Sequence, residues 1–427
     1  MMKYLFIALL VCLLFFQGGR SRAQTAGRIC DVMEFGAQAD GVHKDTVSIQ
    51  AAIDRCAKMG GGTVRLSSGK YLSAPIFLKS QVTLEISADA VLLGSQDIAD
   101  YQVATPNSSL EASEQFLGLV NAIEQTDVAI AGTGTIDGAG QLWWDLDRAA
   151  RQREEPETIR PRLVKFTRCQ RVKVANITLK NSPSFHLVPL FSEDVVIQNI
   201  TIQAPPDSPN TDGIDLILSR RVQISGCKID TGDDNIAIKS SVIDPAHPYA
   251  GSADITITDC TFLHGRGVAI GSGTKGGVNQ VVVERCSFRG TRNGLRIKSG
   301  RDRGGRVANI VYRDIEMEGV SAAISFTSYY PNPPQDDRPQ AITATTPAFQ
   351  DITITNLVSK GGASAGLIVG LPEQPLFNIA LNNVKIDAET GLVIRNATVQ
   401  PTNVQVKVQA GDAFILEERG SLKVNDL

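Results

Sequence analysis

The amino-acid sequence predicts an all-β protein, a right-handed parallel β-helix (solenoid) with an N-terminal capping helix. Short apolar runs of period two recur along most of the chain, are rich in β-branched residues, and are separated by Gly, Asn and Asp. These features are typical of strands and turns. Recurrence every ~20–40 residues indicates a repeat architecture. Because such intervals are too short to contain a crossover helix, successive strands can pair in parallel only by coiling.

Residues 1–23 have the features of an export signal. Lys3 supplies a positive charge, residues 5–16 are apolar, and Ser21-Arg22-Ala23 reads as a cleavage site. No later segment approaches the roughly 20 apolar residues that a transmembrane helix needs, and no linker divides the remainder. We therefore expect a signal peptide at 1–23 and a single β-helix domain at 24–427, secreted or periplasmic. A membrane anchor retained at the N-terminus is the alternative.

The mature chain is expected to be mildly acidic. Of the 42 Lys and Arg residues, three leave with the signal, so 39 remain against 45 Asp and Glu, a net charge near −6. This balance argues against nucleic acid as a partner. An anionic polysaccharide would have to be held by a local cationic patch.

A helical pattern lies near the start of the mature chain, at residues 46–58. Apolar residues follow helical spacing from Val47 to Ala57, and Gly60-Gly61-Gly62 ends the segment. A solenoid exposes its first coil, and an amphipathic helix laid across that end would cover it. We expect a cap without a catalytic role.

The repeat is clearest from residue 172 onward: apolar, any, apolar, two of any type, then Ile or Cys, any, apolar. Its copies begin at Val172, Val195, Val222, Ile255, Val281, Ile310, Ile352 and Ile379, with weaker copies at Val82, Val128 and Val404. In this register Cys227, Cys260 and Cys286 take the position of Ile177, which predicts buried thiols rather than disulfides. Pairing of Cys30 with Cys56 stays open. No CxxC spacing is present, so we expect no zinc site.

Two acidic clusters lie between ladder strands, Asn210-Thr211-Asp212 and Gly232-Asp233-Asp234. The 21 residues from Asp212 to Asp233 make about one coil, so the clusters should stack on neighbouring turns about 4.8 Å apart. Three carboxylates this close cannot all ionise without cost, so at least one should have a raised pKa. Glycoside hydrolysis requires a protonated carboxyl beside an ionised one. The plainer alternative is that these residues only form turns and side-chain ladders.

Arg296-Ile297-Lys298 places two cations two residues apart in an extended segment. Both side chains should therefore lie on one face of the sheet. That arrangement suits a sugar that carries a carboxylate, although cations on a strand are usually only solvated.

Taken together, the motifs resemble those of the polygalacturonases of glycoside hydrolase family 28. They stand in the family's order as Asn210-Thr211-Asp212, Gly232-Asp233-Asp234, Gly265-Arg266-Gly267 and Arg296-Ile297-Lys298, with Phe35-Gly36-Ala37 and Trp143-Trp144 extending the likeness over the mature chain. The resemblance implies hydrolysis of α-1,4 bonds between galacturonic acid residues in pectin-like polysaccharides, by an inverting acid/base mechanism. We expect a monomer with no cofactor or metal, whose partner is the galacturonan chain and not nucleic acid or membrane.

The resemblance also implies roles for single residues. Asp233 would be the general acid, while Asp212 and Asp234 would position and deprotonate the attacking water. Arg296 and Lys298 would bind the galacturonate carboxylate at the cleavage site. Asn210 would support the cluster, and Tyr329, which precedes Tyr330, would contact the substrate.

Arg266 departs from the family, which has His between the two glycines. An imidazole titrates near neutrality, whereas Arg is a fixed cation that can hold a carboxylate bidentately. His264 is two residues away and would share a face with Arg266 on a regular strand. Because flanking Gly265 and Gly267 would leave room for a sugar, we expect Arg266 to bind substrate; a pairing with an acidic neighbour alone is the alternative.

Two other functions stay open. Clustered Asp residues could hold Ca²⁺ in a β-helix pectate lyase, whose elimination product absorbs in the near ultraviolet. Arg266 in place of His would fit a pectin-binding protein with impaired catalysis, which would release no reducing ends. Endo or exo cleavage and the choice among homogalacturonan, rhamnogalacturonan and xylogalacturonan are not determined by the sequence.

Overall fold

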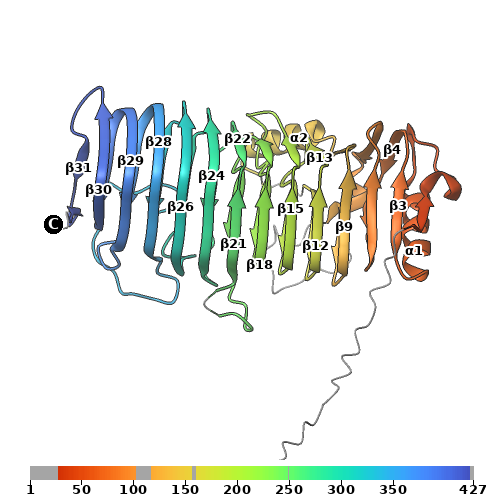
Figure 1. The fold of residues 1–427 in the computed structure, drawn as a ribbon, viewed down its shortest axis with the longest axis horizontal. Helices are drawn as coiled ribbons and strands as arrows, with labels where there is room; N and C mark the ends of the chain where they lie inside the picture. The colour runs from red at the N-terminus through yellow and green to blue at the C-terminus, as the bar shows by residue number, and fades with distance from the viewer. Residues whose placement is uncertain (1–26, 102–116, 156–159, 249, 424–427) are drawn as a thin grey trace, which may run out of the picture.

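A computed structural model describes residues 27–101, 117–155, 160–248 and 250–423. The predicted export signal lies outside these residues. The described part is a right-handed parallel β-helix of 32 strands, in which each strand pairs in parallel with strands of the neighbouring coils. The strands stack side by side along one long axis (Figure 1). The predicted fold class is confirmed.

Three series of strands form the faces of the coil. The first is β1 (Ile29–Asp31), β3 (Gly62–Leu66), β6 (Val82–Ile86), β9 (Thr126–Gly132), β12 (Gln170–Ala175), β15 (Glu193–Gln198), β18 (Arg220–Ser225), β21 (Ser252–Thr258), β24 (Val278–Arg289), β26 (Arg306–Glu318), β28 (Ala348–Val369), β29 (Leu376–Arg395) and β30 (Ala397–Val408). The second is β2 (Asp40–Lys44), β4 (Gly69–Ser73), β7 (Ala90–Gly94), β10 (Thr135–Asp137), β13 (Thr178–Lys180), β16 (Thr201–Gln203), β19 (Lys228–Asp230) and β22 (Thr261–Leu263), continuing into β24, β26, β28 and β29. β32 (Ser421–Leu422) pairs with β30, and two short 3-10 helices are η1 (Val32–Phe35) and η2 (Ile98–Tyr101).

The third series is called the site sheet below. It consists of β5 (Ile76–Phe77), β8 (Gly118–Ile123), β11 (Arg162–Thr167), β14 (Leu187–Leu190), β17 (Ile214–Ile217), β20 (Ile236–Lys239), β23 (Val268–Ile270), β25 (Asn293–Lys298), β27 (Ala322–Thr327), the ends of β28 and β29, and β31 (Phe414–Leu416).

The core is the stack of inward side chains that the repeat predicts. Val172 aligns with Val195, and the same row continues through Val222 and Ile255 to Ile379. All of these side chains are buried. Each such side chain contributes about 1.5–3 kcal/mol when fully buried, and the period of two keeps this apolar set on the inside of every coil.

The cysteines of the described residues are free and buried. Cys227, Cys260 and Cys286 lie in the ladder, as the repeat register predicts, and Cys286 aligns with Ile315 of the next coil. Cys30 and Cys56 are also free thiols.

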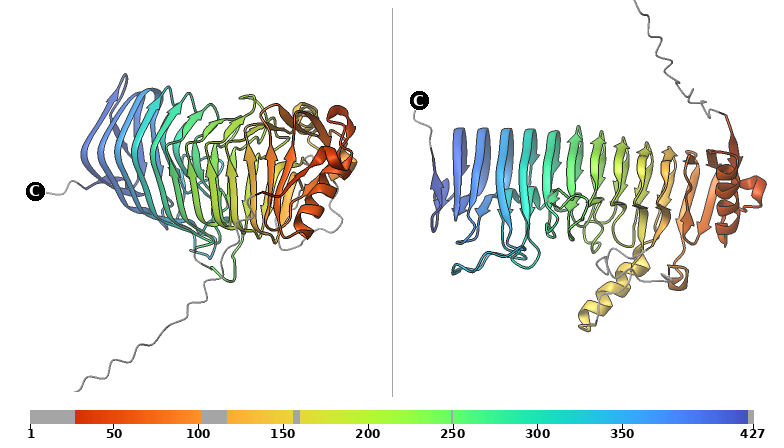
Figure 2. Two further views of the ribbon diagram at one scale, coloured as in Figure 1. Left: turned by 45° about the vertical axis from the view of Figure 1, so that its right-hand side comes forward. Right: turned by 90° about the horizontal axis from the view of Figure 1, so that it is seen from below.

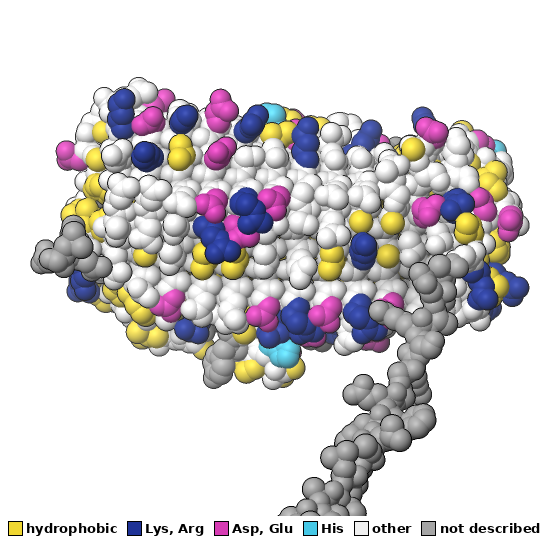
Figure 3. Space-filling view, viewed as in Figure 1, with side chains coloured by type: hydrophobic (Ala, Val, Ile, Leu, Met, Phe, Trp, Pro, Cys, Tyr) yellow, Lys and Arg dark blue, Asp and Glu magenta, His cyan; other side chains and the backbone are white. Residues whose placement is uncertain are grey.

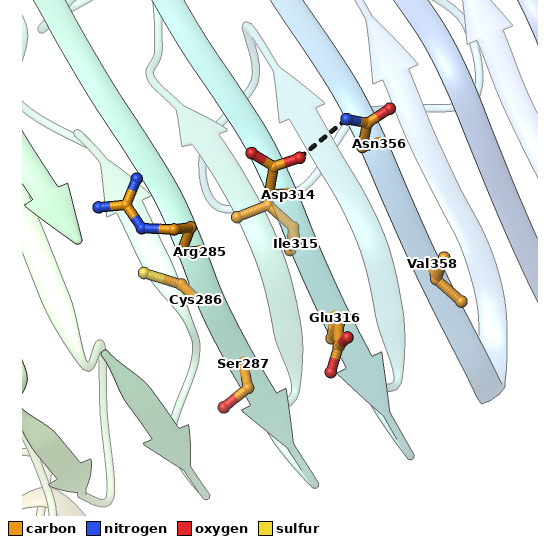
Figure 4. A pocket seen from close by; sticks show the side chains of 8 residues that line it. All are labelled: Arg285, Cys286, Ser287, Asp314, Ile315, Glu316, Asn356 and Val358. Atoms are coloured by element: carbon orange, nitrogen blue, oxygen red, sulfur yellow. Dashed lines mark hydrogen bonds between the residues drawn. The ribbon is translucent and has the colours of Figure 1, made fainter. Parts of the chain in front are cut away.

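Asparagine and aspartate side chains form a second, polar ladder on the outside. The amide of Asn356 donates to Asp314 at 2.8 Å (Figure 4), Asn383 donates to Asn356 at 2.7 Å, and Asn403 donates to Asn383 at 2.9 Å. Each of these residues has φ near +55°, a left-handed conformation that Asn and Asp tolerate better than most residues. The hollow of about 440 Å³ beside this ladder contains none of the predicted site residues.

Helix α1 (Thr46–Lys58) spans the predicted range and lies at the N-terminal end of the coil (Figure 1). Ile49, Ala52, Ile53 and Cys56 are buried, whereas Val47 is 81% exposed. The helix contacts β1, β3 and η1. Its role as a cap stays a prediction.

Helix α2 (Gln141–Gln152) was not expected from the sequence. It projects from the side of the coil that is opposite the face in Figure 1, as does the loop after β27 (Figure 2, right). Trp143 packs edge-on against Tyr101, and the indole of Trp144 donates to the carbonyl of Ser182 at 3.0 Å. Within the described residues, no helix combines the length and apolarity needed to cross a membrane.

Candidate active site

The site sheet brings all four motifs to one side of the coil. Asp212 lies in the turn before β17, Asp233 and Asp234 in the turn before β20, and Arg266 in the turn before β23. β17, β20, β23 and β25 are successive neighbours, so these turns stack. The face that the first series turns outward (Figure 3) carries both basic and acidic side chains, and none of the predicted site residues lies on the strands of this series.

The three carboxylates converge, as the coil spacing predicts. One carboxylate oxygen from each of Asp212, Asp233 and Asp234 lies within 4.8 Å of the other two. All three residues are buried, with exposures of 4%, 8% and 2%. Like charges this close in a poorly solvated site cannot all be ionised without cost.

Burial and neighbouring charges shift the pKa values of the three carboxyl groups in different directions. Burial, reinforced by Asp212 and Asp234, raises the pKa of Asp233 to about 7. Burial and the neighbouring Asp215 likewise raise the pKa of Asp212 to about 7. Burial also opposes ionisation of Asp234, but Lys298 and Arg296 outweigh it and lower the pKa of that carboxyl. The cluster therefore holds a proton near neutral pH while Asp234 stays ionised.

Arg296 and Lys298 share one face of β25, as predicted, and both contact Asp234. The Lys298 Nζ donates to one carboxylate oxygen at 2.7 Å, and an Arg296 Nη donates to the other at 3.3 Å. Lys298 is 6% exposed. The pair thus balances Asp234 and places two cations at the edge of the carboxylate cluster.

Arg266 contacts the carboxylate cluster, with 3.4 Å between its Nη1 and Asp233 Oδ1. Its positive charge lowers the pKa of Asp233 and partly offsets burial. His264 does not share this position: its Nδ1 lies 2.8 Å from Asp230. The strand that would have aligned the two side chains ends at Leu263.

The glycines beside Arg266 are required by the local backbone and its close packing. Gly265 and Gly267 have φ of +89° and +76°, conformations that side chains with a Cβ rarely adopt. A Cβ on Gly265 would lie 2.6 Å from the carbonyl of Asp233, and one on Gly267 would lie 2.1 Å from the carbonyl of Asn293. The glycines let the turn pack against the neighbouring coils.

Asn210 is held by arginines rather than by the carboxylates. Its side-chain oxygen accepts from Arg160 at 2.8 Å and from Arg151 of α2 at 2.7 Å. Arg160 is 2% exposed, also donates to the carbonyl of Pro209 at 2.7 Å, and pairs with Asp147 of α2 at 3.3 Å. Helix α2 thus anchors the turn that presents Asp212.

Tyr329 and Tyr330 differ in their exposure and in their contacts. Tyr329 is 7% exposed and donates its hydroxyl to Asp337 at 2.7 Å. Tyr330 is 41% exposed, and the Lys298 Nζ lies 5.9 Å from its ring centroid. The structure therefore brings Tyr330, more than the predicted Tyr329, to the open side of the site.

Asp215 and Lys239 belong to the site but escaped the sequence analysis. Lys239 pairs with Asp215 and lies 3.4 Å from Asp212 Oδ2. Asp215 is fully buried, and the Lys239 Nζ also lies 4.1 Å from the centroid of the Phe185 ring. The sequence contains a feature that could have identified them. Each is a charged residue in a short, otherwise apolar strand that follows an acidic motif.

Comparison with known proteins gives matches that cover most of the chain. The family model of glycosyl hydrolases family 28 matches residues 70–410. A probable polygalacturonase of Vitis vinifera is 32% identical over 368 residues, covering 83% of this chain and 73% of that protein. The solved polygalacturonase of Erwinia carotovora ssp. carotovora is 30% identical with a TM-score of 0.73, covering 87% of this chain and 96% of that one. The solved exopolygalacturonase of Thermotoga maritima is 27% identical with a TM-score of 0.75, covering 88% and 91%.

Proposed function

The chain belongs to glycosyl hydrolases family 28 and is a glycoside hydrolase, and from this premise we propose that it hydrolyses α-1,4 bonds between galacturonic acid residues of pectin-like polysaccharides. The observation that carries the proposal is the split among three adjacent carboxylates. Asp234 is kept ionised by two cations, while the pKa of Asp233 is raised to about 7. An acid and a base side by side are what hydrolysis of a glycosidic bond requires.

Asp233 is the general acid in this proposal. It protonates the leaving oxygen, and its raised pKa keeps the proton available at mildly acidic pH. Asp234 and Asp212 position the attacking water and accept its proton. Asp212 can ionise when Asp233 holds the shared proton, because Lys239 lies 3.4 Å from Asp212.

An acidic sugar fits the cations around the carboxylates. Arg266, Arg296, Lys298 and Lys239 all lie at the cluster, although the sequence as a whole is acidic. This local cationic patch favours a galacturonate carboxylate at the cleavage site.

Inversion at the anomeric carbon follows from the family resemblance. The carboxylate oxygens lie within 4.8 Å of one another, closer than the ~6.5–9.5 Å usual for inverting enzymes. We therefore assign the water to Asp212 and Asp234 jointly. Proton NMR during digestion tests the assignment: inversion gives β-configured reducing ends first, whereas initial α-configured ends would reject it.

Product chromatography tests the proposed activity. Digests of homogalacturonan, rhamnogalacturonan and xylogalacturonan report substrate, reaction and cleavage mode together. We expect saturated galacturonate products from homogalacturonan. Absence of new reducing ends with retained binding would favour the impaired pectin-binding protein, for which Arg266 is the motivating residue.

The pectate lyase alternative rests on three carboxylates that could hold a cation. Four basic side chains already balance these carboxylates, which leaves little net negative charge for Ca²⁺. Hydrolysis is therefore favoured. Products that absorb in the near ultraviolet, together with loss of activity on chelation, would identify the lyase instead.

The same proposal includes an exported, monomeric protein with one catalytic domain at 24–427. A polymeric substrate outside the cell and the apolar segment near the N-terminus support export. N-terminal sequencing of the mature protein and its sedimentation behaviour are the corresponding measurements.

A further inference from the structure

The outward side chains of the site sheet change character along the coil axis. One aligned row runs through Asp215, Ala237, Ala269, Arg296, Ser325, Leu367 and Val393. The row carries charges at Asp215 and Arg296, with two alanines between them, is polar but uncharged at Ser325, and is apolar from Leu367 onward. Because neighbouring strands are about 4.8 Å apart, Leu367 and Val393 lie about 10–14 Å beyond Arg296 along the axis.

A surface hollow of about 450 Å³ lies over the apolar end of this row. Its apolar lining comes from the two site-sheet strands and from the loop after β27, and consists of Pro333, Pro334, Leu367, Val369 and Val393. The same loop carries Tyr330 towards Lys298. The hollow therefore continues the surface that begins at the carboxylate cluster.

The charges at the hollow are unfavourable for a free carboxylate. Glu417 and Glu418 line it together with one cation, Arg395. The Arg395 guanidinium donates to the carbonyl of Gln335 at 3.2 Å and lies 3.7 Å from Glu417. An ionised galacturonate placed there would meet two glutamates and a guanidinium that is already engaged, within an apolar lining.

We propose that this hollow is a subsite for an uncharged sugar residue of the substrate chain, a galacturonate whose carboxylate is masked as a methyl ester. This assignment rests on the proposed function, because it deepens the substrate of the same site. The polymer lies along the coil axis, with an ionised residue held by Arg296 and Lys298 and an esterified residue in the hollow. The methyl group packs against Leu367 and Val393, which removes apolar surface from water.

The test compares partially methyl-esterified homogalacturonan with de-esterified polygalacturonate of the same chain length. Val393→Lys places a cation in the hollow, and Glu418→Lys reverses an exposed charge at its rim. We expect each variant to lower the ratio of kcat/KM for the esterified polymer to kcat/KM for the de-esterified one by about fivefold. The change should arise mainly from a lower KM for polygalacturonate, with kcat preserved.

Val358→Lys is the matched control, because Val358 lies on β28, the strand that carries Leu367 and Val369, is 38% exposed, and lines a different hollow. It should leave the ratio unchanged. Mass spectrometry of wild-type products should show methyl esters at a fixed number of residues from the new chain end. In the products of Val393→Lys, this number should vary. An unmoved ratio in both Val393→Lys and Glu418→Lys, or an equal shift in Val358→Lys, overturns the subsite. A wild-type protein that cleaves neither polymer overturns the proposed function instead.

Discussion

The middle of the site sheet and its C-terminal stretch have the same backbone and differ in the side chains that they present. β20 and β25 align with their neighbours in the same parallel register as β28 and β29. The inward residues, such as Ile238 and Ile394, are equally buried in one core. In the middle, the strands present the cations Lys239, Arg296 and Lys298, and the turns before them carry the clustered carboxylates. Further along, the outward residues are Leu367, Val369 and Val393. A solenoid can therefore change the chemistry of a surface from coil to coil without changing its scaffold.

Removing the proton donor from the middle of the site sheet should have the largest effect on catalysis. We expect Asp233→Asn to lower kcat on polygalacturonate by at least about 10², the usual contribution of a general acid. Asp230→Asn is the matched control, since Asp230 is close in sequence but pairs with His264. Reducing-end assays and circular dichroism provide the measurements. Activity within a few-fold of wild type would remove Asp233 from this role.

Replacing a cation of the middle stretch should have a large effect as well. Lys298→Met leaves the buried Asp234 with Arg296 alone, so we expect kcat/KM to fall about 100-fold. Since Lys298 lowers the pKa of Asp234, its loss raises that pKa and moves the acidic limb of the pH–rate profile to higher pH. Lys360→Met, on the exposed outer face of β28, should change neither quantity. An unshifted acidic limb in Lys298→Met would contradict the ion-pair assignment.

Replacing Arg266 should have a smaller effect, a shift of the pH–rate profile in one direction. Its charge lowers the pKa of Asp233, and the general acid must be protonated to act. Replacement by Ala, or by a His that is neutral at alkaline pH, should raise this pKa and move the alkaline limb to higher pH by about half a unit. The wild-type optimum should accordingly be more acidic than that of Arg266→His. If both KM and the alkaline limb are unchanged in Arg266→Ala and Arg266→His, Arg266 is a bystander.

The core beneath both stretches predicts the smallest effect on catalysis. Cys227, Cys260 and Cys286 are buried free thiols, so they should resist labelling in the native protein and react after denaturation. Cys260→Ala should lower the free energy of unfolding by about 1–2 kcal/mol through lost packing and leave kcat unchanged. A disulfide among the three by mass spectrometry would refute the ladder register.

The amino-acid sequence by itself determined the solenoid, the buried cysteine ladder and the convergence of Asp212, Asp233 and Asp234. These features follow from period and spacing, because the distance from one copy of a repeat to the next fixes which residues stack. The extent of helix α1 followed from local periodicity in the same way.

Tertiary structure alone decided how the polar residues pair. It assigned Lys298 and Arg296 to Asp234, Arg266 to Asp233, His264 to Asp230, and Asn210 to the arginines at α2. It also gave Tyr330 the open position and added Asp215 and Lys239. Such pairings depend on where turns between strands direct long side chains, and left-handed residues such as Gly265 and Gly267 break the alternation that the sequence displays. Strand periodicity fixes the face on which a side chain lies, whereas the packing of neighbouring coils selects its partner.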